Sequence, residues 1–237
     1  MDNPFSRTEM LLGNEGMNKL KKSNVAIFGI GGVGSFVAES LARCGIGSIV
    51  LIDYDIIDIT NINRQIHATH KTIGRPKVEV MKERILDINP EINIHIYNSC
   101  LNQSNSHELI SKEYDYVVDA IDMVSSKLEL IEKCKNMNIP IISSMGTGNK
   151  LNPNELRVGD IYETSVCPLA KVMRRELRKR GIKDLKVVWS KEEPIKTGIF
   201  KEGTNRPVPG SISFVPSVAG LIIASEVVKD IVNKEDF

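Results

Sequence analysis

The stretch Val25-Ala-Ile-Phe-Gly-Ile-Gly-Gly-Val-Gly-Ser35 decides the fold of this chain. An apolar run ends there in glycines with the spacing G-x-G-x-x-G, a helical pattern follows, and Asp53 closes the next apolar run. A strand, a tight glycine turn, a helix and a second strand ending in an acid form a nucleotide-binding unit, in which the acid accepts the ribose hydroxyls. The helix N-terminus offers free N–H groups to a phosphate. The stretch therefore predicts a nucleotide cradle at Gly29, Gly31, Gly32 and Gly34.

Strand and helix patterns alternate over the first part of the chain. The helix at 75–88, for example, has Pro76 near its start and apolar residues at helical spacing. Alternation of this kind predicts an α/β, Rossmann-like, doubly wound and mostly parallel sheet with helices on both faces. Residues 10–22 predict two short helical pieces broken at Gly13 and Gly16. The expected strands are 24–29, 47–52, 92–97, 115–119 and 140–145, and the expected helices are 32–44, 75–88 and 123–137.

The pattern changes after Gly146, where an extra C-terminal strand-helix region is expected. Short strands at 155–159 and 187–190, a basic helix at 169–180 and a final helix at 216–232 are predicted. Residues 191–210 predict a long loop of low order that closes over the acceptor beside the nucleotide. No linker marks a second domain, so we expect one domain over 1–237. It would comprise a nucleotide-binding core at about 20–146, a substrate-facing region at about 147–214 and the C-terminal helix.

Bulk composition excludes several classes of protein. The 237 residues carry a formal net charge of +1, so overall charge points to no partner. The four cysteines form no C-x-x-C pair, which argues against structural zinc and for a reduced, intracellular setting. The N-terminus lacks the regions of a signal peptide, and the apolar stretch at 214–228 is too short and polar to span a bilayer. We expect a soluble cytoplasmic protein without a membrane partner.

Polar motifs after the glycine turn separate this chain from NAD-dependent dehydrogenases. They read Asp53-Tyr-Asp55, Asn61-Ile-Asn63-Arg64-Gln65, Gly74-Arg75-Pro76-Lys77 and Asp119-Ala-Ile-Asp122. In this order and spacing, over residues 5 to about 145, the chain resembles the ThiF/MoeB family and the adenylation domains of ubiquitin-activating enzymes. The resemblance implies ATP as the cofactor and activation of a carboxylate.

The second half narrows this resemblance to one branch. Ser144-Met-Gly-Thr-Gly-Asn149, the stretch at 151–160, the basic helix and the stretch at 214–221 are similar to the tRNA threonylcarbamoyladenosine dehydratases. The resemblance implies ATP-dependent dehydration of threonylcarbamoyladenosine in tRNA to its cyclic form, through activation of the threonyl carboxylate as an acyl adenylate. It implies tRNA, and not DNA, as the nucleic-acid partner.

Adenylation builds charge on phosphate oxygens, so the site needs cations around the triphosphate. Arg64 and Lys77 supply a planar fork and a point charge, and both suit phosphate. By resemblance, Arg7 would reach the triphosphate from the neighbouring protomer of a homodimer, and Asp122 would hold Mg²⁺. The expected catalytic residues are Arg64, Lys77, Asp122 and Arg7. The expected nucleotide-binding residues are Gly29, Gly31, Gly32, Gly34, Asp53, Asp55, Asn61, Arg64, Lys77 and Asp122.

Basic residues concentrate between Lys171 and Lys186, a stretch that contains eight basic residues and two acidic ones. A charge run is usually a solvated helix face, but a local excess in a chain that is neutral overall predicts contact with tRNA phosphates. The predicted tRNA-binding residues are Lys171, Arg174, Arg175, Arg178 and Lys179.

Several other residues have a plainer interpretation. We expect Asp119 to be structural, and Trp189 and Cys167 to be buried, because single residues of these last two types usually pack in a core. The sequence does not decide whether Lys127 faces the nucleotide or solvent. His67 and His70 are expected to be solvated, as loop histidines usually are.

Two other functions stay open at this stage. One is adenylation of the C-terminus of a ubiquitin-like sulfur-carrier protein, whose enzymes typically hold a zinc with two C-x-x-C pairs that this chain lacks. The other is a non-catalytic nucleotide-responsive protein, which Arg64, Lys77 and Asp122 disfavour. The Asp-Asn pair common at the magnesium position is Asp122-Met123 here. A monovalent cation and a sulfur-transfer partner protein are compatible with the resemblance, but the sequence identifies neither.

Overall fold

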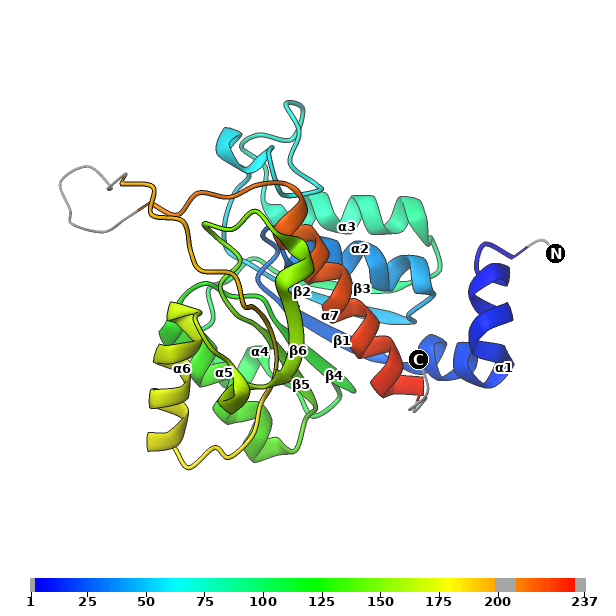
Figure 1. Cartoon of the computed structure of the whole chain (residues 1–237). Helices are drawn as coiled ribbons and strands as arrows, with labels where there is room; N and C mark the ends of the chain where they lie inside the picture. The colour runs from blue at the N-terminus through cyan, green and yellow to red at the C-terminus, as the bar shows by residue number, and fades with distance from the viewer. Residues whose placement is uncertain (1–2, 199–207, 233–237) are drawn as a thin grey trace.

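One sheet with helices on both faces organises the chain (Figure 1). The structure is a computed structural model and describes residues 3–198 and 208–232. The strands are β1 Asn24–Phe28, β2 Ser48–Ile52, β3 Asn93–Tyr97, β4 Tyr116–Asp119, β5 Ile141–Ser144, β6 Leu156–Asp160 and β7 Lys186–Ser190. The helices are α1 Ser6–Lys22, α2 Gly34–Cys44, α3 Lys77–Ile88, α4 Ser106–Leu109, α5 Val124–Met137, α6 Pro168–Lys179 and α7 Phe214–Val232. Short 3-10 turns are η1 Ile59–Asn61, η2 Pro153–Glu155 and η3 Ile161–Glu163.

The seven strands have the order β3-β2-β1-β4-β5-β7-β6. Every neighbouring pair is parallel except β6 with β7, which is antiparallel and forms one edge. The predicted doubly wound, mostly parallel sheet is therefore confirmed, and β6, β7 and α7 form the expected C-terminal extension. The strand order reverses between β1 and β4, because β2 lies on one side of β1 and β4 on the other. Open α/β sheets bind ligands at such a point.

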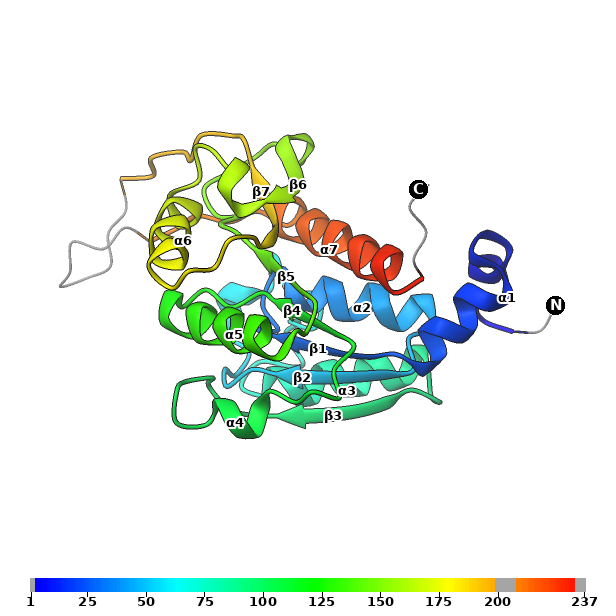
Figure 2. The ribbon, with the colours of Figure 1, turned by 90° about the horizontal axis from the view of Figure 1, so that it is seen from below.

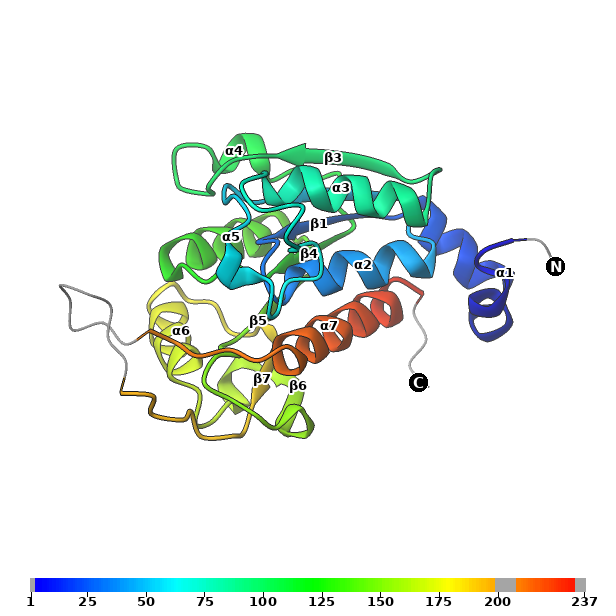
Figure 3. The ribbon, with the colours of Figure 1, turned by 90° about the horizontal axis from the view of Figure 1, so that it is seen from above.

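Alternating side chains on the strands divide the core into two layers. Ile27 of β1 belongs to the layer under α2, α3 and α7, whereas Phe28 belongs to the layer under α5 and α6. Figure 3 looks onto the first set of helices, and Figure 2 onto the face that α5 covers. Trp189 and Cys167 are buried in the second layer, as predicted.

Helix α7 lies against the start of α2, and a glycine permits this close approach. A Cβ added to Gly220 would meet the main-chain oxygen of Val33 at 2.5 Å. Pro216, in the first turn of α7, lies close to the glycine turn: a Cβ added to Gly32 would be 3.2 Å from Pro216 Cβ. The C-terminal helix thus supports the segment that the sequence predicts to bind phosphate.

Two local predictions were incomplete. The break at Gly13 is confirmed by its φ of 72° and ψ of 171°, but Gly16 is helical and buried. A Cβ on Gly16 would lie 2.9 Å from Leu12 Cβ, so the kinked helix leaves no room for a side chain there. The short helix α4 was missed, because four residues are too few for a helical period.

The predicted loop at 191–210 lies in part outside the described residues, which omit 199–207. Its described ends are fastened to Asn149. The main-chain oxygen of Asn149 accepts from Ile195 N at 2.8 Å, and its main-chain N–H donates to Gly210 O at 2.8 Å. Within 3–198 and 208–232, no helix has the length and apolar character needed to cross a bilayer.

Candidate nucleotide-binding and active site

A cleft of about 970 Å³ opens at the carboxyl ends of the parallel strands. The glycine turn after β1 and the loops after β2, β4 and β5 line it, together with the segment that carries η1. Of the residues predicted to bind nucleotide, Gly34 alone is absent from the lining, because it stands behind the turn. The cleft therefore brings together predicted residues that are up to ninety-three positions apart in the sequence, from Gly29 to Asp122.

The glycines of the turn are required for different physical reasons. Gly29 has a φ of +89°, and a Cβ there would lie 2.6 Å from the main-chain oxygen of Ala120. A Cβ on Gly34 would lie 1.8 Å from the oxygen of Gly29, so helix α2 could not approach the strand. The nearest atom to a Cβ on Gly31 is Gln65 Nε2 at 4.0 Å, so the backbone at Gly31 borders open cleft.

Asp53 holds the turn as well as lining the cleft. Its Oδ2 accepts from Ile30 N at 2.6 Å, and its Oδ1 accepts from Asp55 N at 2.8 Å. Burial raises the pKa of Asp53, and the positive charge of Lys77 opposes that shift. Two of its lone pairs are used by these bonds and others face the cleft, so the carboxylate can still accept ribose hydroxyls.

Lys77 lies at the start of α3, and its side chain is only 6% exposed. Its Nζ donates to Asp55 Oδ2 at 2.6 Å, and its main-chain N–H donates to Asp55 O at 3.0 Å. Both residues line the cleft. The lysine is thus paired with an acid, and a phosphate that binds in the cleft would have to compete for it.

Asn61 is the last residue of η1, and Arg64 follows it in the same loop, where its side chain lies beside Gly32 of the glycine turn. Asn61 is buried, and its Oδ1 accepts from Asp58 N at 3.1 Å, which closes the turn. Arg64 Nη1 donates to Thr60 O at 2.8 Å and to Asn63 Oδ1 at 3.0 Å. No acid pairs with Arg64 in the described part of the chain, so its remaining N–H groups are available to an anion.

The loop after β4 rests on a buried ion pair. Lys127 Nζ lies 2.9 Å from Asp119 Oδ2, and both side chains are fully buried. The same Nζ donates to Ile121 O at 3.0 Å and to Ser144 O at 2.9 Å. Lys127 therefore faces neither nucleotide nor solvent, and Asp119 is structural as predicted. Asp122, the next residue of the loop, is exposed and lines the cleft.

Two residues near the cleft were not predicted. His67 is 2% exposed, so the expectation that it is solvated was wrong, and neither ring nitrogen has a hydrogen-bond partner among residues 3–198 and 208–232. Burial, together with the charges of Lys77 and Arg84, lowers the pKa of His67 to about 4. Gln65 is also buried and lines the cleft. Its place in the Asn61–Gln65 motif was the available signal, because it follows Arg64 directly.

Arg7 does not belong to this cleft. It is exposed on α1, which lies at the end of the molecule opposite to α6 (Figure 2). Arg7 is absent from the residues that line the cleft. Any role at a nucleotide would therefore be exerted on another copy of the chain.

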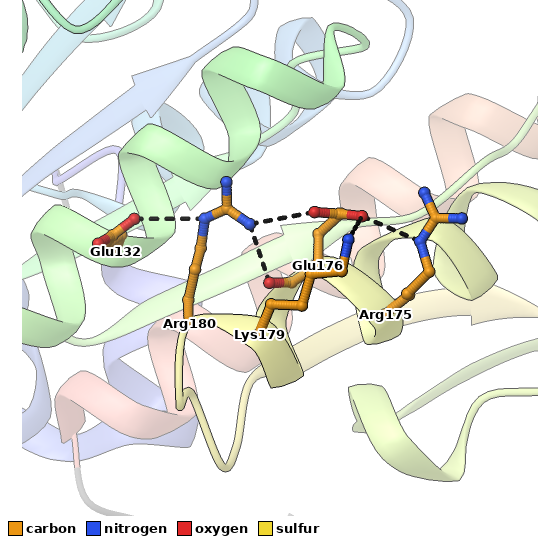
Figure 4. Close-up of polar contacts among 5 residues, drawn as sticks. All are labelled: Glu132, Arg175, Glu176, Lys179 and Arg180. Atoms are coloured by element: carbon orange, nitrogen blue, oxygen red, sulfur yellow. Dashed lines mark hydrogen bonds and ion pairs between the residues drawn. The ribbon is translucent and has the colours of Figure 1, made fainter.

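The basic helix α6 starts at the cleft, where Leu169 of its first turn is part of the lining. Two of the five residues predicted to contact tRNA, Arg175 and Lys179, are paired with an acid of the same helix. Arg175 Nε donates to Glu176 Oε1 at 2.9 Å, and Lys179 Nζ donates to the same oxygen at 3.0 Å (Figure 4). These hydrogen bonds lower the pKa of Glu176 to about 2. Arg174 donates instead to Thr164 O at 2.8 Å.

A doubly wound sheet, a glycine turn at its switch point and cations across the cleft define a nucleotide-binding protein of the Rossmann-like class. The ThiF family model matches residues 5–237. The chain is 45% identical to the tRNA threonylcarbamoyladenosine dehydratase of Bacillus subtilis, over 96% of this chain and 94% of that protein. The chain belongs to the ThiF family and, within it, to the family of these dehydratases.

Two crystal structures agree with this assignment. They are of the Escherichia coli tRNA N6-threonylcarbamoyladenosine dehydratase, TcdA, one in complex with AMP and one with ATP. Both are similar to this chain with a TM-score of 0.89 and 34% identity, over 97% of this chain. The match covers 94% of the AMP-bound chain and 93% of the ATP-bound chain.

Proposed function

We propose that this protein catalyses the ATP-dependent dehydration of threonylcarbamoyladenosine in tRNA to its cyclic form. The observation that carries the proposal is the cleft itself, which a glycine turn lines together with two cations, Arg64 and Lys77, at the switch point of the sheet. The family assignment and the nucleotide-bound relatives support the same reaction. The protein would act on tRNA, in the cytoplasm.

The chemistry starts with a poor nucleophile and a poor leaving group. The threonyl carboxylate attacks the α-phosphorus of ATP and displaces pyrophosphate, and the acyl adenylate that forms carries AMP as a good leaving group. Arg64 and Lys77 stabilise the charge that grows on the phosphate oxygens, and each such donor is typically worth about 10²–10³ in kcat. The amide nitrogen of the substrate then closes the ring and displaces AMP, so no protein nucleophile is needed. Cys167 is buried, which agrees with this route.

Each wall of the cleft would hold one part of ATP. Gly29, Gly31 and Gly32 would bring backbone N–H groups and the start of α2 to the phosphates. Asp53 would accept the ribose hydroxyls. Asp55 would release Lys77 to the triphosphate, and Asn61 would keep the η1 wall in place through its bond to Asp58.

Asp122 fits the requirement for a magnesium ligand. It is exposed in the cleft and has no ion pair in the part of the chain that the structure describes. Mg²⁺ typically uses one or two carboxylates, with phosphate oxygens and water completing the shell. When bound, the ion would neutralise charge on the triphosphate. Asp122 would hold it, and the Asp119–Lys127 pair would keep the loop of Asp122 in position.

We also propose that the protein is a homodimer in which Arg7 reaches the cleft of the second copy. Arg7 is exposed and does not line the cleft of its own chain, and its helix α1 lies at the end of the molecule away from α6 (Figure 2), which supports this arrangement. We propose a single domain over 1–237, with the core, substrate-facing region and C-terminal helix divided as the sequence suggests. The ThiF match over 5–237 supports one unit.

The reaction can be tested with tRNA that carries threonylcarbamoyladenosine. The purified protein is incubated with this tRNA, ATP and Mg²⁺, and the digested nucleosides are analysed by mass spectrometry. We expect the nucleoside to lose one water, with AMP formed in equal amount. Arg64→Ala should abolish most of the product, whereas Lys71→Ala, an exposed cation outside the cleft, should not.

The same assay separates the alternatives. An unchanged nucleoside, with adenylation of a ubiquitin-like carrier protein added in its place, would overturn the proposal in favour of that activity. Release of ADP in place of AMP would keep the dehydration but replace the acyl adenylate with an acyl phosphate.

A further inference from the structure

The basic helix α6 has two faces that differ in charge balance. On one face, Glu176 binds Arg175, Lys179 and Arg180, and Arg180 Nε also lies 3.4 Å from Glu132 Oε2 of α5 (Figure 4). These cations are partly neutralised and point into a network that ties α6 to α5. We call this the acid-paired face.

The second face carries Lys171, Arg174 and Arg178, which follow the helical spacing i, i+3, i+7. None of the three has an ion pair with an acid in the portion of the chain that is described. Arg178 Cζ lies 5.0 Å from the centre of the Tyr162 ring, and Arg174 Nη1 donates to Thr164 O at 2.8 Å. We call this the acid-free face.

Contacts with the segment after β6 hold the two arginines of the acid-free face. A guanidinium that lies over an aromatic ring keeps its N–H groups free at its edges. Arg174 uses one of its nitrogens on Thr164, so donors also remain there. Glu163, an acid of the same segment, has its Oε2 bonded to Asp160 N at 3.3 Å. Held guanidinium groups lose less entropy when they bind a phosphate.

The acid-free face also lies close to the cleft. It begins two residues after Leu169, which lines the cleft, and runs along the helix away from it. At 1.5 Å per residue, Arg178 is about 14 Å along the axis from Leu169. A positive strip that starts beside the cleft suits an extended polyanion whose modified nucleoside enters the cleft.

From these contacts we infer that Lys171, Arg174 and Arg178 bind the phosphate backbone of the tRNA substrate, whereas Arg175 and Lys179 stay paired with Glu176. The inference rests on the proposed function and deepens it, because it divides a run of similar residues into contacts and supports.

Two double variants with the same change in charge test the inference. K171Q/R178Q neutralises the acid-free face, and R175Q/K179Q neutralises the acid-paired face. Binding of tRNA that carries threonylcarbamoyladenosine is measured by fluorescence anisotropy over a series of salt concentrations. Each lost phosphate contact lowers the slope of log K against log salt by roughly 0.7–0.9. Thermal midpoints and ATP affinity of both variants show whether the fold and the cleft are intact.

We expect K171Q/R178Q to weaken tRNA binding about tenfold at moderate salt and to reduce the salt slope by roughly 1.4–1.8. R175Q/K179Q should stay within about twofold of the wild type, because it removes no phosphate contact. Equal losses in the two variants, with a wild type that dehydrates the nucleoside, would overturn the inference and leave the proposed function standing. A wild type that leaves the nucleoside unchanged would overturn both.

Discussion

The buried Asp119–Lys127 pair gives the sharpest test of the structural reasoning. Lys127→Met keeps the length of the side chain and removes its charge and its donors. Asp119 then keeps its bonds from Ser143 Oγ and Ile121 N but has no counter-charge in a fully buried position. Loss of one partner of a buried ion pair typically costs about 3–5 kcal/mol. Loss of donors to Ile121 O and Ser144 O contributes to this cost.

For a chain of this length, such a loss lowers the thermal midpoint by on the order of 10 °C. Circular dichroism melts and urea unfolding at neutral pH would measure it. The double variant Asp119→Asn/Lys127→Met removes the stranded charge and should recover a large part of the stability. A loss of less than about 1 kcal/mol in the single variant, the value of one ordinary hydrogen bond, would contradict the buried ion pair. A double variant no more stable than the single one would contradict it as well.

Three further outcomes follow from the described geometry. Arg64→Ala should lower kcat of the ATP-dependent reaction by about 10²–10³ and change ATP affinity less, because the charge that Arg64 meets grows in the transition state. Single-turnover kinetics measure the first value and equilibrium ATP binding the second. A fall in ATP affinity alone would contradict this role. Gly34→Ala should abolish ATP binding by isothermal calorimetry, since its Cβ would lie 1.8 Å from Gly29 O; a variant with normal affinity would refute the close-packed turn. His67 has a pKa of about 4 in the folded chain, below the value of about 6.5 for an unfolded histidine, so its contribution to stability is present above pH 6.5 and is lost as the pH falls towards 4, at up to about 1.4 kcal/mol per pH unit. Urea unfolding of His67→Leu should lack this share of the acid sensitivity, and parallel curves for the two proteins would count against the burial of a neutral ring.

The fold was predictable because its signals are local. The glycine turn, the apolar runs and the helix at 75–88 can each be read within a short window, and the alternation of strands and helices then leaves few topologies. The cleft was predictable for a related reason. Residues that follow successive parallel strands meet at one edge of the sheet, so Asp53 and Asp122 had to lie close together.

What the sequence left open depends on contacts between distant elements. Nothing near Lys127 indicates that its ammonium turns inward, because its partners Asp119 and Ser144 lie on β4 and β5. The burial of His67 likewise arises from tertiary packing near Lys77 and Arg84 of α3. The two faces of α6 could be predicted in part from the sequence, since Glu176 stands one residue after Arg175 and three before Lys179. The link of Arg180 to Glu132 required the structure.

The bond between Lys77 and Asp55 has a consequence for selectivity among nucleotides. A ligand that is to recruit Lys77 must first displace a carboxylate 2.6 Å away, in a place where the lysine side chain is 6% exposed. A monophosphate would bring a charge of about −1.5 to −2 to compete with the single negative charge of Asp55. A triphosphate would bring several such groups and would also engage Arg64. The pair would thereby favour ligands with a full phosphate chain, and it would let a monophosphate leave as the lysine returns to Asp55.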